Sequence, residues 1–200
     1  MFFRVIVIIS ILSISGCRPI AYMLFGVNKP KYLTEDEIVR YANKKKLGTA
    51  NLYFVKDTIA ENEIYKNVLQ AYDSLGKSFS FAFPDALVFD PKGINIAYAQ
   101  NDSVCNGALF GFLQNLYPGY KAGIESNYTF SDFNKLIKPY NNEHKLSENS
   151  YKLVILWAVW TGRANKTHLP QWELLAAQNK KLTIEVIKLN MDFKNKRFVQ

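Results

Sequence analysis

Helical and strand-like spacings of apolar residues follow one another along most of the chain, which is typical of an α/β fold. Apolar residues three and four apart predict helices, and glycine or proline ends them. Short continuous or alternating apolar runs predict strands. The expected helices cover 34–48, 64–75, 103–116, 131–139 and 165–179, and the expected strands cover 52–56, 85–90, 94–99, 152–159 and 183–189.

Local capping and turn signals support several of these boundaries. Thr34 and Glu37 form a capping box at the start of the first helix, and Gly48 is expected to end that helix. The segment 90–93, Asp-Pro-Lys-Gly, has the residue preferences of a type I turn and predicts a hairpin. Asp102 or Ser103, and later Ser131, are candidate helix N-caps. Residues 119–130 are expected to form a loop, and 141–150 a polar linker.

The N-terminal residues follow another pattern, with Arg4, an apolar run over 5–14, and then Ser15-Gly16-Cys17. A membrane-spanning helix needs ~20 apolar residues, so this run is too short to span a bilayer. Its length matches the apolar region of a secretory signal peptide. An ordinary signal peptide with an incidental Cys17 is the alternative interpretation.

The residues Ile14-Ser15-Gly16-Cys17 resemble a bacterial lipobox. This resemblance implies cleavage after Gly16 and attachment of acyl chains such as palmitate to Cys17. Stable anchoring needs at least two chains or signals, and a diacylglyceryl group would supply them. The chain would then consist of a signal peptide (1–16), a lipidated tether (17–33) and one domain (34–200), held on a membrane of the cell envelope and facing the periplasm or the surface.

Composition narrows the possible chemistry. The chain is 48% hydrophobic and 21% charged, so it is globular rather than disordered. Its net charge of +8 is scattered, which favours solvated surface charge over a nucleic-acid site for an exported protein. Lipidation of Cys17 would leave Cys105 without a disulfide partner. With one free cysteine and two separated histidines, His144 and His168, we expect neither a metal site nor a cofactor.

A second family pattern occupies 153–192. An apolar strand leads into Trp157-Ala-Val-Trp160-Thr161-Gly162-Arg163-Ala164, and a later strand ends in Asn190-Met-Asp192. These residues resemble the thioredoxin pattern of a strand, then Trp-Ala-x-Trp-Cys-Gly-x-Cys, a helix, and a strand that ends in an Asn-x-Asp turn. The resemblance implies a thioredoxin-like three-layer sandwich with a mixed central sheet.

The cysteines of that pattern are replaced. Thr161 and Ala164 stand at the two cysteine positions. Thiol–disulfide exchange needs a thiolate and a resolving thiol, so this motif cannot carry it out. We interpret Thr161 as a candidate helix N-cap. Arg163 and Lys166, near the start of the helix, are candidates for binding an anion.

The order of the elements suggests a circular permutation. The family helix, proline-led hairpin and last helix are expected after 189, but matching segments lie upstream instead. A lone βαβ unit would leave its sheet uncovered. We therefore predict one sheet in the order 52–56, 183–189, 152–159, 85–90, 94–99, with 85–90 antiparallel to its neighbours. Pro84 would lie at the same end as Thr161, either as the cis-proline of the family or as a trans-proline at a strand start.

Three functions remain open. The leading one is a redox-inactive binding or assembly module of the envelope, for which the resemblance implies a peptide groove; our groove candidates are Trp157, Trp160, Gly162, Arg163 and Pro84. The second is a monothiol oxidoreductase that uses Cys105, although free cysteines are usually buried and inert. The third is a structural lipoprotein without a small ligand. Trp157, Trp160 and Trp172 are expected to lie in the core or to line the groove, and His168 is expected to be an exposed or capping residue.

Overall fold

The computed structural model describes residues 28–74, 84–96, 107–120, 125–141 and 146–192. A mixed sheet runs through its centre in the order β4-β3-β2-β6-β7-β1-β5. The strands are β1 (Leu52–Val55), β2 (Asp85–Phe89), β3 (Ile94–Ile96), β4 (Glu125–Thr129), β5 (Ile137–Pro139), β6 (Tyr151–Trp157) and β7 (Ile184–Asn190). The expected α/β class with a mixed sheet is confirmed.

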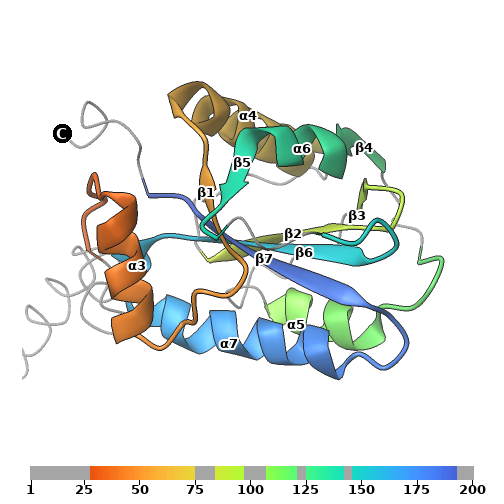
Figure 1. Cartoon of the computed structure of the whole chain (residues 1–200). Helices are drawn as coiled ribbons and strands as arrows, with labels where there is room; N and C mark the ends of the chain where they lie inside the picture. Colours follow the sequence, from red (N-terminus) through yellow and green to blue (C-terminus); the bar gives the residue numbers. More distant parts are fainter. Residues whose placement is uncertain (1–27, 75–83, 97–106, 121–124, 142–145, 193–200) are drawn as a thin grey trace, which may run out of the picture.

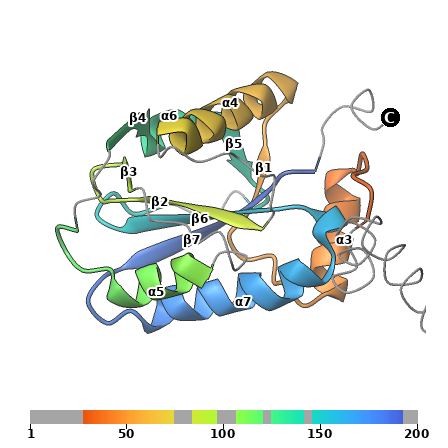
Figure 2. The same cartoon turned by 180° about the vertical axis from the view of Figure 1, so that it is seen from behind.

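Helices cover both faces of this sheet. They are α3 (Glu35–Lys44), α4 (Thr58–Ser74), α5 (Gly107–Asn115), α6 (Phe130–Leu136) and α7 (Arg163–Gln178), with a short 3-10 turn, η1 (Val159–Thr161), before α7. In Figures 1 and 2, α4 and α6 lie on one face and α5 and α7 on the other. The arrangement is therefore an α/β sandwich, with α3 beside the end of the sheet at which α7 begins.

The predicted order of the five central strands is confirmed. β6 pairs with β7 in parallel, and β7 pairs with β1 in parallel. β2 runs antiparallel to β6, with Asp85 opposite Leu156 and Phe89 opposite Lys152. The upstream hairpin and the C-terminal βαβ unit thus share one sheet, as β6 needs because its residues are buried along its whole length.

Side chains that alternate along β6 build the two halves of the core. Leu153, Ile155 and Trp157 face the side that α3, α5 and α7 cover. Val154 and Leu156 face the side that α4 and α6 cover. Both clusters draw residues from before and after the middle of the chain, so neither half would bury its apolar face alone.

The edges of the sheet differ from the expectation. The predicted loop 119–130 contains β4, which pairs with β3, and the end of the predicted helix 131–139 is β5, which pairs with β1. The helix between them begins after Thr129, whose hydroxyl accepts a hydrogen bond from the Asp132 N–H, and not after Ser131. These short segments form strands because they hydrogen-bond to neighbouring strands. The local apolar pattern of the sequence gives no information about such pairing.

Helix boundaries follow the capping groups that are present. The Thr34–Glu37 capping box is confirmed. α3 ends at Lys44, earlier than the expected Gly48. α4 begins before the predicted residue 64, because the Asp57 carboxylate accepts hydrogen bonds from the N–H groups of Ile59 and Ala60. Among the helices of the described residues, we find none that combines the length and the apolar character needed to cross a bilayer.

The predicted hairpin turn is also present. The Gly93 N–H donates to the Asp90 carbonyl, and the Asp90 carboxylate accepts from the N–H groups of Lys92 and Ile94. Gly93 has a φ of 80°, which favours glycine. The returning strand is described only as far as Ile96; residues 97–99, along with the caps Asp102 and Ser103, lie outside the described residues.

Candidate functional site

The segment that carries the thioredoxin resemblance lies at the carboxyl ends of β6 and β7. β6 ends at Trp157, and η1 and the first turn of α7 follow directly. Because Asp85 pairs with Leu156, Pro84 enters the sheet at this same end, as predicted. Ligands of open α/β sheets commonly bind beyond the carboxyl ends of parallel strands. A binding site is therefore expected at this end of the sheet.

Asp192 joins the end of β7 to this turn. Its buried carboxylate accepts hydrogen bonds from the Val159 N–H and from Asn190 Nδ2, each at 2.7 Å. The Met191 N–H donates to the Trp157 carbonyl. The Asn-x-Asp turn therefore fixes where η1 leaves the sheet, and with it the positions of Trp160 and Gly162.

Thr161 differs from its expected role. Its side chain is buried, and its hydroxyl oxygen lies 2.7 Å from both the Ala158 carbonyl oxygen and Asn165 Oδ1. Asn165 Nδ2 donates to that same carbonyl. The N-cap of α7 is Gly162, so the prediction of Thr161 as the cap is wrong: the hydroxyl is held by η1 and by the side chain of Asn165. Ala164, at the second cysteine position, is partly buried.

Gly162 occupies a backbone conformation that only glycine adopts easily, with φ 62° and ψ −118°. We predict that Gly162→Ala lowers the free energy of unfolding by about 1–3 kcal/mol. Gly111→Ala is the matched control, since Gly111 lies within α5 and an added Cβ has no neighbour within 4 Å. It is expected to raise stability by about 0.5–1 kcal/mol. Urea unfolding of both variants measures whether the free energy of unfolding falls for Gly162→Ala and rises for Gly111→Ala. Equal changes in the two variants would contradict the prediction.

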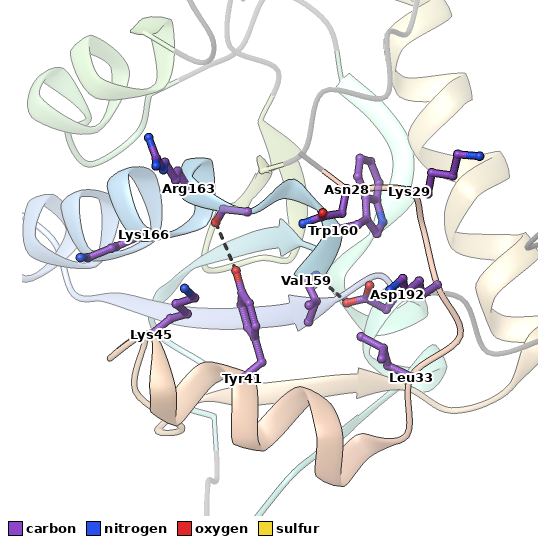
Figure 3. A pocket seen from close by; sticks show the side chains of 12 residues that line it. Asn28, Lys29, Leu33, Tyr41, Lys45, Val159, Trp160, Arg163, Lys166 and Asp192 are labelled. Atoms are coloured by element: carbon purple, nitrogen blue, oxygen red, sulfur yellow. Dashed lines mark hydrogen bonds between the residues drawn. The ribbon is translucent and has the colours of Figure 1, made fainter. Parts of the chain in front are cut away.

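A cavity of about 460 Å³ opens against this turn. We call it the motif cavity. Its walls come from the segment 28–33, from α3, from η1 with the first turn of α7, and from Asp192 (Figure 3). The Asn28 N–H donates to the Trp160 carbonyl at 2.7 Å, so the end of the expected tether packs against the motif.

Tyr41 of α3 forms the contact between the two main walls. Its hydroxyl donates to the Gly162 carbonyl at 3.2 Å (Figure 3), and its ring stacks on Trp157 with a centroid separation of 6.3 Å. Burial raises the pKa of Tyr41, so the hydroxyl stays protonated near neutral pH. Lys45 Nζ lies 5.9 Å from the centre of the same ring.

The structure brings together some of the candidate residues and separates others. Trp160, Gly162 and Arg163 line the motif cavity. Trp157 is almost fully buried in the core instead, and Pro84 is buried at the start of β2. Cys17 and Cys105 lie outside the described residues, and so does Phe83, which forms the peptide bond with Pro84.

The two remaining aromatic candidates pack together. Trp172 is buried in the core, which is one of the two positions expected for it. His168 is partly buried and stacks on Trp172 at 5.3 Å, so the expectation of an exposed or capping histidine is wrong. This burial lowers the pKa of His168.

About half of the residues that line the motif cavity lie upstream of the Trp157–Ala164 motif and could not be predicted from it. Lys29, Lys31, Leu33, Tyr41 and Lys45 lie more than a hundred residues before the motif. The pairing of β1 with β7 and the packing of α3 in the core bring α3 and the preceding segment close to the motif. No sequence signal near these residues pointed to a shared site.

We compared the chain with known proteins. No protein-family model, no curated protein and no solved structure matches it.

Proposed function

We propose that this chain is a membrane-anchored lipoprotein of the cell envelope, lipidated at Cys17, whose permuted thioredoxin-like domain is redox-inactive. We propose further that the domain binds a peptide segment of a partner protein in the motif cavity. The family groove beside the same motif binds extended peptide, and loss of the cysteines removes the redox chemistry while leaving such a surface available.

One observation carries this proposal. The Trp160-Thr161-Gly162-Arg163 turn borders a cavity of about 460 Å³, while the Thr161 hydroxyl is turned inward and engaged with η1 and Asn165. Volumes of this size are typical of ligand sites. The cavity is open, but the residue at the first cysteine position of the thioredoxin pattern, Thr161, does not direct a nucleophile into it. Such a site is better suited to binding than to catalysis.

Site-specific photocrosslinking in the native host tests the proposal. A benzophenone amino acid replaces Trp160 in the full chain, and Leu174 serves as the control because it is exposed on α7 away from the cavity. We expect discrete higher-mass adducts from position 160 and none from position 174. Absence of adducts at both positions would contradict the binding module and favour a purely structural lipoprotein.

The same experiment separates the monothiol alternative. A binding module retains its adducts at position 160 when Cys105 is replaced by serine, and reducing agent does not change them. An oxidoreductase that uses Cys105 holds its partner through a mixed disulfide. Loss of the adducts in Cys105→Ser would therefore support the enzyme and contradict the proposed function.

A further inference from the structure

The motif cavity is bordered by five basic side chains that come from three separate parts of the chain. They are Lys29 and Lys31 from the segment before α3, Lys45 at the end of α3, and Arg163 and Lys166 from the start of α7. All five are exposed at the rim. The sequence offered only the pair on α7; the fold adds the three lysines.

The acidic residue among those that line the cavity, Asp192, offsets only part of this charge. Asp192 is about 2% exposed, and its carboxylate already accepts hydrogen bonds from Val159 and Asn190. Its role is to hold the turn in place. The opening of the cavity therefore presents positive charge to an incoming group, and clefts lined by one sign of charge concentrate ligands of the opposite sign.

The start of α7 departs from the charge pattern of α3 and α6, which have acidic residues in the first turn and a lysine in the last. α3 has Glu35, Asp36 and Glu37 in its first turn and Lys44 in its last, as the helix dipole favours. α7 has no acidic residue in its first turn, begins with Arg163, and receives no side-chain cap from the described residues. Cations at a helix start weaken the fold slightly, and local rules are commonly broken where function requires it.

Apolar groups form the rest of the cavity wall. Leu33, Val159 and Trp160 line it next to the cations. A binding site of this composition suits a ligand that carries negative charge beside an apolar group. A flat lipid surface cannot enter a cavity, whereas an acidic side chain with an apolar neighbour on a peptide can.

We propose that the motif cavity selects acidic peptide segments, in which an aspartate or glutamate carboxylate pairs with the basic rim and a neighbouring apolar side chain packs on Trp160. This inference rests on the proposed function, since it names the ligand class of the same site. The carboxylate is expected to form charge-assisted hydrogen bonds with Arg163, which can bind it through two N–H groups.

The test selects a randomised decapeptide phage library on the immobilised full-length protein. Three proteins are compared: the wild type, Arg163→Glu/Lys166→Glu, and the control Lys92→Glu/Lys181→Glu. The control makes the same change in charge on exposed lysines that line a depression at the opposite end of the sheet. Glutamate in the first turn of α7 is favoured by the helix dipole, so the cavity variant is expected to fold; its circular dichroism spectrum and unfolding midpoint check this.

We expect peptides recovered on the wild type and on the control to be enriched in aspartate and glutamate over the starting library. The Kd of a recovered acidic peptide should rise at least about tenfold in the cavity variant, and the binding should weaken from 0.15 M to 1 M salt. Enrichment without an acidic preference would overturn this inference and leave peptide binding in place. No enrichment at all would overturn both.

Discussion

Replacing Trp157 with alanine is expected to lower the free energy of unfolding by about 3–5 kcal/mol. Among the described residues, Trp157 has the largest side chain that is fully buried. It is also the last residue of β6, the strand that joins the two halves of the sheet. Its cluster includes residues of α3, β1 and β2 from the first half of the chain and of α7 and β7 from the second. The substitution removes its stacking on Tyr41 and leaves a cavity between these elements.

Urea unfolding followed by circular dichroism measures the effect. Leu174→Ala is the control, because Leu174 lies in the same C-terminal unit and is 56% exposed; its effect should stay within about 0.5 kcal/mol. A loss below about 1 kcal/mol for Trp157→Ala, or a second unfolding step in the wild type, would contradict a core shared by both halves.

The central strands could be predicted because their sequences carry two kinds of information. The apolar run 153–157 is buried on both faces, so it needs a neighbour on each side and a helix on each face. The resemblance to the thioredoxin pattern predicted β7 as one neighbour of β6. The Asp90–Gly93 turn predicted a hairpin, whose first strand, β2, is the other neighbour. The order of the five strands followed from these constraints.

The edge strands and half of the site could not be predicted in this way. β4 and β5 are short and depend on partners distant in the sequence, since β5 pairs with β1 through Tyr53 and Pro139. Thr161 has a residue type that suits an N-cap, yet Asn165 and the Ala158 carbonyl bind its hydroxyl and leave the cap to Gly162. Such competition between partners is decided by tertiary geometry.

The strongest departure from the hydrophobic pattern within β6 is Lys152, whose side chain is about 5% exposed. Its Nζ donates to the carbonyls of Ser147 and Ser150 and to the Ser150 hydroxyl, and it lies 3.3 Å from Glu185 Oε2. The ammonium also lies 5.6 Å from the centre of the Phe130 ring. This cluster fixes the linker before β6 to β7 and neutralises a charge that would otherwise be buried alone.

Burial alone would raise the pKa of Glu185, but hydrogen bonds from the Ser150 hydroxyl, the Ser147 N–H and Lys152 outweigh it and lower the pKa below the usual 4.5. A carboxyl whose pKa is lower in the folded than in the unfolded state stabilises the fold above the unfolded pKa. That contribution is therefore complete above about pH 4.5 and is lost as the pH falls through the lower, folded value.

Glu185→Gln is accordingly expected to lower the free energy of unfolding by about 3 kcal/mol at pH 7, because it leaves the buried Lys152 ammonium without its counter-charge. The difference from the wild type should shrink below pH 4.5, where the wild-type carboxyl becomes protonated. Adding Lys152→Met to Glu185→Gln removes the unpaired charge and should recover most of the loss. Urea titrations from pH 3 to 7 on the wild type, Glu185→Gln, Lys152→Met and the double variant give the coupling energy between the two residues. A coupling energy near zero would show that the pair does not stabilise the fold. A difference between Glu185→Gln and the wild type that does not change with pH would show the same.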